Sequence, residues 1–303
     1  MTVSPRVVVC HRQTEYDALL AHHGTRGQAA FFLSGRGRDL AEVEARHDAV
    51  RRGLDAVAAA IPLEWRRGSV EREDLARYLF TPDDIVVVVG QDGLVPNVAK
   101  YLDGQPVIGV NPDPAANAGL LCQAAPEQVA DLLAAVVAGR ASVEERTMVR
   151  LAVDDGQELL ALNEIYVGQA NHQSSRYTVR IGGPDGVAER QSSSGVLIGT
   201  GTGATGWCSS AARERHCDFA LPTPADGRLA WFVREAWPSP NTGTAYTAGL
   251  LESSGELVLD VESDSLVAFG DGVEVDHLTL AWGQRVTVSV ARRTLRLVGP
   301  PAP

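Results

Sequence analysis

The first half of the chain alternates short apolar runs with longer amphipathic segments. Residues 6–10 and 84–89 are valine-rich runs, a pattern typical of strands that are buried on both faces of a parallel sheet. Between them, residues 39–61 carry apolar side chains at three- and four-residue intervals up to Pro62, which predicts a long helix. Further strands are predicted at 63–66 and 106–110, and further helices at 14–22, 72–79, 96–102 and 126–138. We therefore expect an α/β domain with a Rossmann-like parallel sheet.

From about residue 145 the pattern changes to short alternating runs separated by Gly, Asp and Ser. These runs predict strands at 146–153, 159–167, 176–181, 195–198, 257–261, 266–269, 278–280, 285–290 and 295–298. A mainly β, sandwich-like domain is expected here. The predicted boundaries are 1–142 for the α/β domain, 143–285 for the β-rich substrate domain, and 286–303 for a C-terminal strand that can return to the first domain.

Composition narrows the class of partner. The chain has 303 residues, 45% hydrophobic and 21% charged, with a net charge of −11, which fits a folded protein of two domains. Basic residues do not cluster with aromatic ones, so nucleic acid is not expected as a partner. No apolar run is long enough to span a membrane and no cleavable leader is visible. We expect a cytoplasmic protein that acts on small molecules, with its four cysteines as free thiols.

One short motif follows the most apolar of the predicted strands. Gly90-Gln91-Asp92-Gly93 lies where that strand turns toward a helix, which is the place where open α/β sheets bind ligands. Glycines let the backbone approach a phosphate, and an aspartate can orient a metal ion or accept a proton during phosphoryl transfer. The same four residues also fit a plain turn in which Asp92 is only a cap.

A second motif, residues 199–206, is a run of Gly and Thr between a strand and a helix. Its amides, with the hydroxyls of Thr200, Thr202 and Thr205, can surround phosphate oxygens at the start of a helix. No Gly-Lys-Ser/Thr follows, so the motif is not a Walker P-loop. A flexible surface hairpin is the alternative interpretation.

A third motif is the pair Asn163-Glu164, set between apolar residues in the β-rich half. Alone, this pair fits an ordinary edge strand. The three motifs in this order, together with residues 143–148 and Asp271-Gly272, resemble the NAD kinase family, whose members carry a GGDG turn, an Asn-Glu pair and a Gly/Thr/Ser loop. The resemblance runs from about residue 84 to residue 298.

The resemblance implies that the ATP γ-phosphoryl group is transferred to the 2′-hydroxyl of the adenosine ribose of NAD(H), giving NADP(H), at a site between the two domains. Asp92 would be the catalytic carboxylate, and no residue is assigned as a metal ligand. The residues implied in nucleotide binding are Gly90, Gly93, Asn163, Glu164, Ser194, Thr200, Thr202, Gly203, Thr205, Trp207 and Asp271. ATP and Mg²⁺ are the implied cosubstrate and cofactor, and a homodimer or homotetramer is the implied assembly.

Three positions depart from the family pattern and leave the acceptor open. Gln91 replaces the second glycine of the turn, Ser194 replaces an aspartate and Trp207 replaces a tyrosine. Two alternatives therefore remain beside the NAD kinase activity. One is a kinase of the same fold that acts on another nucleoside, sugar or lipid alcohol, and the other is a dinucleotide sensor without turnover.

Overall fold

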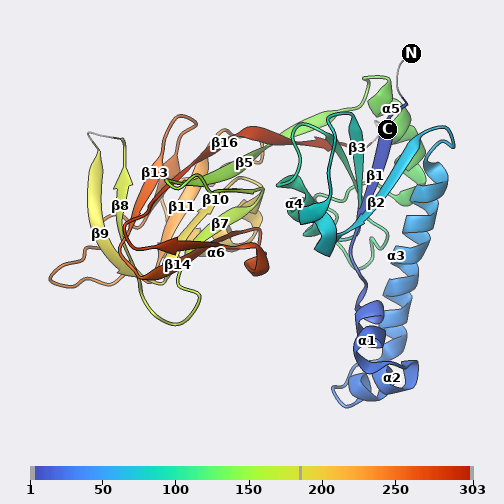
Figure 1. Cartoon of the computed structure of the whole chain (residues 1–303), viewed down its shortest axis with the longest axis horizontal. Helices are drawn as coiled ribbons and strands as arrows, with labels where there is room; N and C mark the ends of the chain where they lie inside the picture. Colours follow the sequence, from blue (N-terminus) through green and yellow to red (C-terminus); the bar gives the residue numbers. More distant parts are fainter. Residues whose placement is uncertain (1–3, 184–185, 301–303) are drawn as a thin grey trace. The chain divides into compact units, whose positions relative to one another are not determined.

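The computed structural model describes residues 4–183 and 186–300, which form two compact units. The first unit comprises the chain up to Glu144 together with the segment from Arg296 onward, and the second comprises Glu145–Leu295. Figure 1 shows parallel strands with helices in the first unit and a β-rich second unit. This architecture confirms the fold class expected from the change of hydrophobic period near residue 145.

The first unit is built on a parallel sheet. Its strands lie in the order β2, β1, β3, β4, followed by the end of β16, which pairs in parallel with β4 through Arg296 and Leu297. The strand bounds are β1 Arg6–His11, β2 Arg66–Glu71, β3 Asp84–Val89 and β4 Pro106–Val110. Every residue of β3 is buried, as expected for a strand with elements on both faces.

Helices complete this unit. They are α1 Glu15–His23, α2 Arg26–Ser34, α3 Leu40–Ala60, α4 Leu94–Ala99 and α5 Val129–Val137, with 3₁₀ turns η1 Arg72–Arg77 and η2 Pro126–Gln128. The helices α3 and α5 cover the sheet through Val57, Leu132 and Leu133, which share one core with the valines of β1 and β3. At the other end of α3, the helices α1 and α2 pack around Leu33 and Val43 in a small separate core (Figure 1).

The second unit contains two antiparallel sheets. One has the strand order β12-β11-β10-β7-β14-β15. The other pairs β16, β13, β8 and β9 in this order, with β5 paired to β16 and β6 paired to β5. The strand bounds are β5 Val143–Val153, β6 Glu158–Ala161, β7 Glu164–Gly168, β8 Ser175–Ile181, β9 Val187–Ser193, β10 Gly195–Gly199, β11 Leu229–Arg234, β12 Ala248–Leu251, β13 Leu257–Val261, β14 Ser265–Gly270, β15 Leu278–Ala281 and β16 Arg285–Val298. Helix α6 spans Trp207–Arg215, and η3 and η4 span Gly203–Thr205 and Glu274–Asp276. One core of buried side chains from both sheets fills the space between them.

Several predicted elements are wrong in detail. The two strands expected at 285–290 and 295–298 are the single strand β16. The strand expected at 63–66 is a turn, because the Trp65 amide donates back to the Pro62 carbonyl, and the strand β2 begins only at Arg66. The helix expected at 72–79 is the short 3₁₀ helix η1. The single strand expected at 159–167 is two strands, β6 and β7, with a break at Leu162 and Asn163. Among the described residues, no helix has the length and apolar character that crossing a membrane requires.

Candidate active site

The turn after β3 is shaped by one glycine. Gly90 has φ 154°, a conformation that side chains disfavour, and its amide donates to the Val110 carbonyl at 3.0 Å. Gly93 has φ −63°, and a Cβ added there would meet no atom within 4 Å. Gln91 does not adopt a positive φ, so a side chain at this position, where the family has glycine, causes no backbone strain. The fold therefore explains a glycine at position 90 but not at position 93.

Asp92 is tied to the chain segment that follows β4. Its Oδ1 accepts the amides of Leu121 and Cys122 at 2.8 and 2.9 Å, and its Oδ2 accepts the amide of Leu120 at 2.9 Å. A carboxylate that accepts three amides fixes one loop against another. Asp92 does not cap the helix α4, whose N-cap is Gly93 without a side-chain hydrogen bond, but it does have a structural role in holding the segment after β4.

In the second unit, the Asn163-Glu164 pair occupies the break between β6 and β7. The Asp271 carboxylate accepts the amides of Leu162 and Asn163 at 3.0 and 2.6 Å, and the Asp271 amide donates to the Glu164 carbonyl at 3.0 Å. Asp271 holds φ 54°, a left-handed conformation that few side chains adopt. The two amides that would continue the strand are thus bound by a side chain, and this explains why the predicted single strand is broken.

The Gly/Thr loop packs onto the same two residues. The Thr200 amide donates to the Asn163 carbonyl at 2.8 Å, and the Thr200 hydroxyl donates to the Leu162 carbonyl at 2.5 Å. That hydroxyl in turn accepts the amide of Thr202 at 3.1 Å and, at 3.4 Å, that of Gly203. The loop is therefore an ordered element of the fold and not a free hairpin.

Two glycines of this loop are required by close packing. A Cβ on Gly201 would lie 1.9 Å from the Thr223 carbonyl oxygen, and a Cβ on Gly203 would lie 2.4 Å from that of Asn163. No side chain can occupy such positions without moving the backbone. Thr205 lies in η3, where its hydroxyl reaches only the Thr202 carbonyl, at 3.5 Å.

Two polar groups at this cluster stand out electrostatically. Burial, together with the neighbouring Asp271 carboxylate, raises the pKa of Glu164 to about 7. The Thr202 hydroxyl is buried and has no hydrogen-bond partner within the described part of the chain. A carboxyl group that is partly protonated near neutral pH and a hydroxyl without a partner are suited to hydrogen bonding with a polar ligand.

Ser194 and Trp207 are linked through Tyr166, a residue that the sequence analysis missed. The Tyr166 hydroxyl donates to the Ser194 carbonyl at 2.5 Å, and its ring stacks on Trp207 with a centroid separation of 5.8 Å. The Arg234 guanidinium lies 4.9 Å from the centre of the Trp207 ring. Tyr166 follows Glu164 by two residues in β7, so strand periodicity was a signal that could have placed it on the same face.

The predicted site residues therefore fall into two groups. Asn163, Glu164, Thr200, Thr202, Gly203 and Asp271 are brought together in the second unit, whereas Gly90, Asp92 and Gly93 lie in the first. Within the described residues, no group of three or more His, Cys, Asp or Glu side chains is arranged to hold a metal ion. A magnesium ion would thus fit this chain as a companion of nucleotide phosphates, with one or two carboxylates at most.

No model of a known protein family matches the chain. Individual proteins do. The chain is 27% identical to the NAD kinase of Haloarcula marismortui over 227 residues, which cover 72% of this chain and 74% of that protein. It is 32% identical to the NAD kinase of Methylococcus capsulatus over 163 residues, or 51% of this chain and 52% of that protein. The match to the NAD kinase of Chlorobaculum tepidum, at 25% identity, spans about half the length of that protein, 47%.

A solved structure shares the fold along nearly the whole chain. The crystal structure of an NAD kinase from Archaeoglobus fulgidus in complex with ATP superposes with a TM-score of 0.58, covering 98% of this chain and 94% of that one at 18% identity. At 18% identity this structural similarity indicates a shared fold only. The similarity in sequence to NAD kinases comes from the matches given above. The chain is therefore similar in sequence to several NAD kinases and shares the fold of one of them.

Proposed function

We propose that the chain is an NAD kinase, which transfers the γ-phosphoryl group of ATP to the 2′-hydroxyl of the adenosine ribose of NAD(H). In this reaction a bond forms between the ribose oxygen and the γ-phosphorus, and the bond from that phosphorus to the bridging oxygen of ADP breaks. The hydroxyl proton leaves to a base or to solvent, and the products are NADP(H) and ADP.

One observation carries the proposal. Three motifs that are far apart in the sequence meet at the backbone of Leu162 and Asn163, where Asp271 binds the two amides and Thr200 binds the two carbonyls. Four polar backbone groups are thereby fixed by two other segments, three of them by side chains and the Asn163 carbonyl by the Thr200 amide. Such convergence holds Asn163, Glu164 and Thr202 in fixed positions, as a binding site requires. The named relatives of the chain are NAD kinases.

The residues divide the work in the following way. Asn163, Glu164 and the loop that contains Thr202 and Gly203 bind nucleotide groups by hydrogen bonds. Asp92 orients the attacking hydroxyl or accepts its proton, using the lone-pair capacity that its three amide contacts leave. Mg²⁺, when bound with ATP, balances the charge of the phosphates.

The setting of the activity is also proposed. We place the protein in the cytoplasm, where ATP and NAD are available, and expect it to work as a homodimer or homotetramer. Nucleic acid and membrane surfaces are not expected as partners, because the chain carries a net charge of −11.

The test is a direct assay of the purified full chain. NAD or NADH is incubated with ATP and MgCl₂, and the product is identified by mass and by its use in an NADP-specific dehydrogenase reaction. Phosphorylated dinucleotide is the expected product. A parallel set of reactions offers nucleosides, sugars and a diacylglycerol as acceptors, and polyphosphate as donor.

Two outcomes would replace the proposal. Transfer to another acceptor in preference to NAD would make the chain a kinase of different specificity. Tight binding of NAD without turnover of any acceptor would make it a dinucleotide sensor. The relatives named above favour neither outcome.

A further inference from the structure

A polar pocket lies at the far end of the strands that carry the candidate active site. Its volume is about 660 Å³, within the range of small-molecule sites. The pocket is formed by the loop 169–174 after β7, the turn 262–265 before β14 and the side chain of Trp282. The strands β7 and β14 pair antiparallel. Glu164 and Asp271 lie together at one end of this pair, and the pocket lies at the other end. The pocket is therefore separate from the Asn163-Glu164 cluster.

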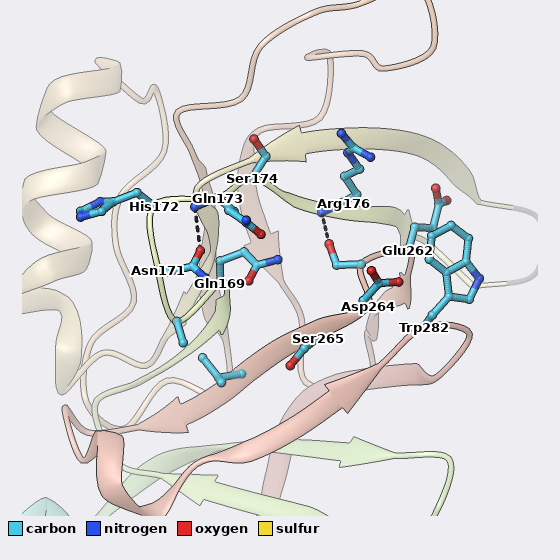
Figure 2. A pocket seen from close by; sticks show the side chains of 13 residues that line it. Gln169, Asn171, His172, Gln173, Ser174, Arg176, Glu262, Asp264, Ser265 and Trp282 are labelled. Carbon is cyan, nitrogen blue, oxygen red and sulfur yellow. Dashed lines mark hydrogen bonds between the residues drawn. The ribbon is translucent and has the colours of Figure 1, made fainter.

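The wall of this pocket is held by hydrogen bonds of its own. The Ser175 hydroxyl accepts the Gln169 amide at 2.9 Å, and the Asn171 side chain accepts the Gln173 amide at 2.8 Å. The Ser263 hydroxyl accepts the Arg176 amide at 2.9 Å, which joins the strand β8 to the turn before β14. Figure 2 shows the last two bonds as dashed lines. The backbone of the pocket is thus formed without a ligand.

Several side chains in the pocket are left available. Figure 2 shows Gln169 and Gln173 on one side of the pocket, with Asp264 and Trp282 on the other. Within the described residues, the side chains of these four residues make no hydrogen bond or ion pair. Trp282 is 62% exposed, which is unusual for so large an apolar ring. The pocket therefore offers two amides, a carboxylate and an aromatic surface.

The charge of the pocket decides between ligand classes. Glu262 is already engaged, because its carboxylate accepts from Thr178 and pairs with Arg190. Arg176 lines the pocket, but its guanidinium points away from Asp264 in Figure 2. The lining also includes the hydroxyls of Ser174 and Ser265 and the imidazole of His172. The space is therefore lined mainly by uncharged polar groups beside the Asp264 carboxylate, in a chain of net charge −11, which favours a neutral polar ligand over an anion.

We propose that this pocket binds a neutral, polyhydroxylated ligand, such as a sugar. Each hydroxyl of a sugar can both donate and accept a hydrogen bond, which matches the accepting carboxylate of Asp264 and the amides of Gln169 and Gln173. The apolar C–H face of a sugar ring packs on an exposed indole, as Trp282 provides. The site and its ligand class do not depend on the NAD kinase activity.

Calorimetric titration of the full chain tests the proposal. The probes are D-glucose, D-galactose, D-ribose and trehalose, with L-arginine and inorganic phosphate as probes of other charge classes. We expect at least one sugar to bind with a Kd of about 0.1–10 mM, as is usual for a small open site. Trp282→Ala and Asp264→Asn should each weaken that binding about tenfold or more.

A matched variant guards against indirect effects. Trp237 is also exposed, at 43%, and does not line the pocket, so Trp237→Ala should leave sugar binding unchanged. Thermal unfolding of all three variants serves as a check of folding. The proposal is overturned if no sugar binds at concentrations up to about 50 mM. It is also overturned if Trp282→Ala and Asp264→Asn bind sugar as tightly as the parent does, or if phosphate or L-arginine binds and the sugars do not.

Discussion

The contacts of Asp92 give it a structural role and leave room for the catalytic role that we propose. An ionised carboxylate has about four lone-pair positions, and the amides of residues 120–122 use three of them. One position remains to bind a hydroxyl group or water. The structural role that Asp92 has, which is to hold residues 120–122 and not to cap α4, is therefore compatible with the proposed catalytic role. The two roles also imply that the effects of mutation on stability and on activity must be measured separately.

We expect Asp92→Asn to lower both stability and turnover. An asparagine can place only one accepting oxygen among the three amides, and its NH₂ group then faces a donor, which should cost about 1–3 kcal/mol of unfolding free energy. Turnover should fall by about two to four orders of magnitude, the range for a lost acid-base group. Urea unfolding and an assay of NADP formation measure the two effects. Asp83→Asn, the same exchange at an exposed position before β3, is the control. Normal turnover by Asp92→Asn would remove it from the chemistry.

The two glycines of the turn after β3 allow folding and ligand binding to be separated. Gly93→Ala should leave stability unchanged or raise it by about 0.4–1 kcal/mol, because its backbone suits alanine and the added Cβ meets open space. Its affinity for ATP should fall if a phosphate approaches this backbone closely. Gly90→Ala is the contrasting variant and should be destabilised, since φ is 154° there. Calorimetry with ATP and thermal unfolding give the two readouts, and ATP affinity that is unchanged in Gly93→Ala would place the phosphates elsewhere.

Glu164 should make stability depend on pH in a defined window. Its pKa is raised from an ordinary 4.5 to about 7, mainly by burial, so the folded protein binds this proton more tightly than the unfolded chain does. The stabilising contribution of the proton is complete below about pH 4.5 and is lost as the pH rises through 7. Glu164→Gln removes this loss. Relative to the parent, the variant should gain about 1–3 kcal/mol of stability between pH 5 and pH 8, measured by urea unfolding. A constant difference between the two proteins across this range would contradict the assignment.

At the scale of elements, the segment from Ser194 to Trp207 acts as one connected piece. It contains β10, the Gly/Thr loop and the first residue of α6, and Tyr166 of β7 contacts both of its ends. The Ser194 amide also donates to the Arg234 carbonyl at 2.9 Å, and the Arg234 guanidinium lies over Trp207. The two departures from the family pattern are therefore neighbours of the same tyrosine, although thirteen positions separate them in the sequence.

This connection supports a test of acceptor specificity. The double variant Ser194→Asp with Trp207→Tyr should change the KM for NAD more than the KM for ATP, because the resemblance to NAD kinases implies that both positions contact the acceptor. A new carboxylate near Arg234 should also alter the local charge. Steady-state kinetics with each substrate varied in turn measure the two constants. Trp237→Tyr, the same aromatic exchange at another exposed position, should change neither constant. Equal changes in both constants would mean that the loop does not contact the acceptor.

The sequence predicts long periodic elements better than short ones. The helix α3 and the strand β3 are found within a residue of their predicted bounds, because each has an uninterrupted pattern. Helix α2 was not predicted, since its apolar residues serve a small local core with α1 and α3 and show little periodicity. The strands β9 and β11 were missed as well. Polar residues dominate β9, whereas β11 is buried throughout except for its last residue, and neither alternates clearly.

The candidate site was only partly accessible to sequence reasoning. Motif order identified Asn163, Glu164, Asp271 and the Gly/Thr loop, but not the hydrogen bonds that join them, because these bonds connect segments up to 109 positions apart. The same holds for Asp92, whose amide partners lie 28–30 positions further along the chain. Side-chain to backbone bonds between distant loops leave no periodic trace in a sequence, and only the fold reveals them.

For the whole molecule, the net charge of −11 opposes the binding of ATP and NAD that we propose. The proposed binding would therefore depend on local groups and on Mg²⁺. The chain has a single lysine, Lys100, and its other basic side chains are arginines, many of which pair with carboxylates. Backbone amides of the glycine-containing loops are a further local source of positive potential.

Ligand binding should therefore be visible as stabilisation that requires Mg²⁺. A ligand that binds only the folded protein stabilises it by about 2.7 kcal/mol when present at 100 times its Kd. For a cooperative unit of about 150 residues, each kcal/mol raises the thermal midpoint by about 2–4 °C, so saturating ATP with MgCl₂ should raise it by about 5–10 °C. NAD should also raise the midpoint. Differential scanning fluorimetry measures both shifts, with sodium sulfate at equal ionic strength as the control for general anion effects. Because like charges oppose binding in this acidic chain, ATP with EDTA should give a much smaller shift than ATP with MgCl₂. If no adenine nucleotide changes the midpoint in the presence of MgCl₂, neither a kinase nor a dinucleotide sensor describes this protein.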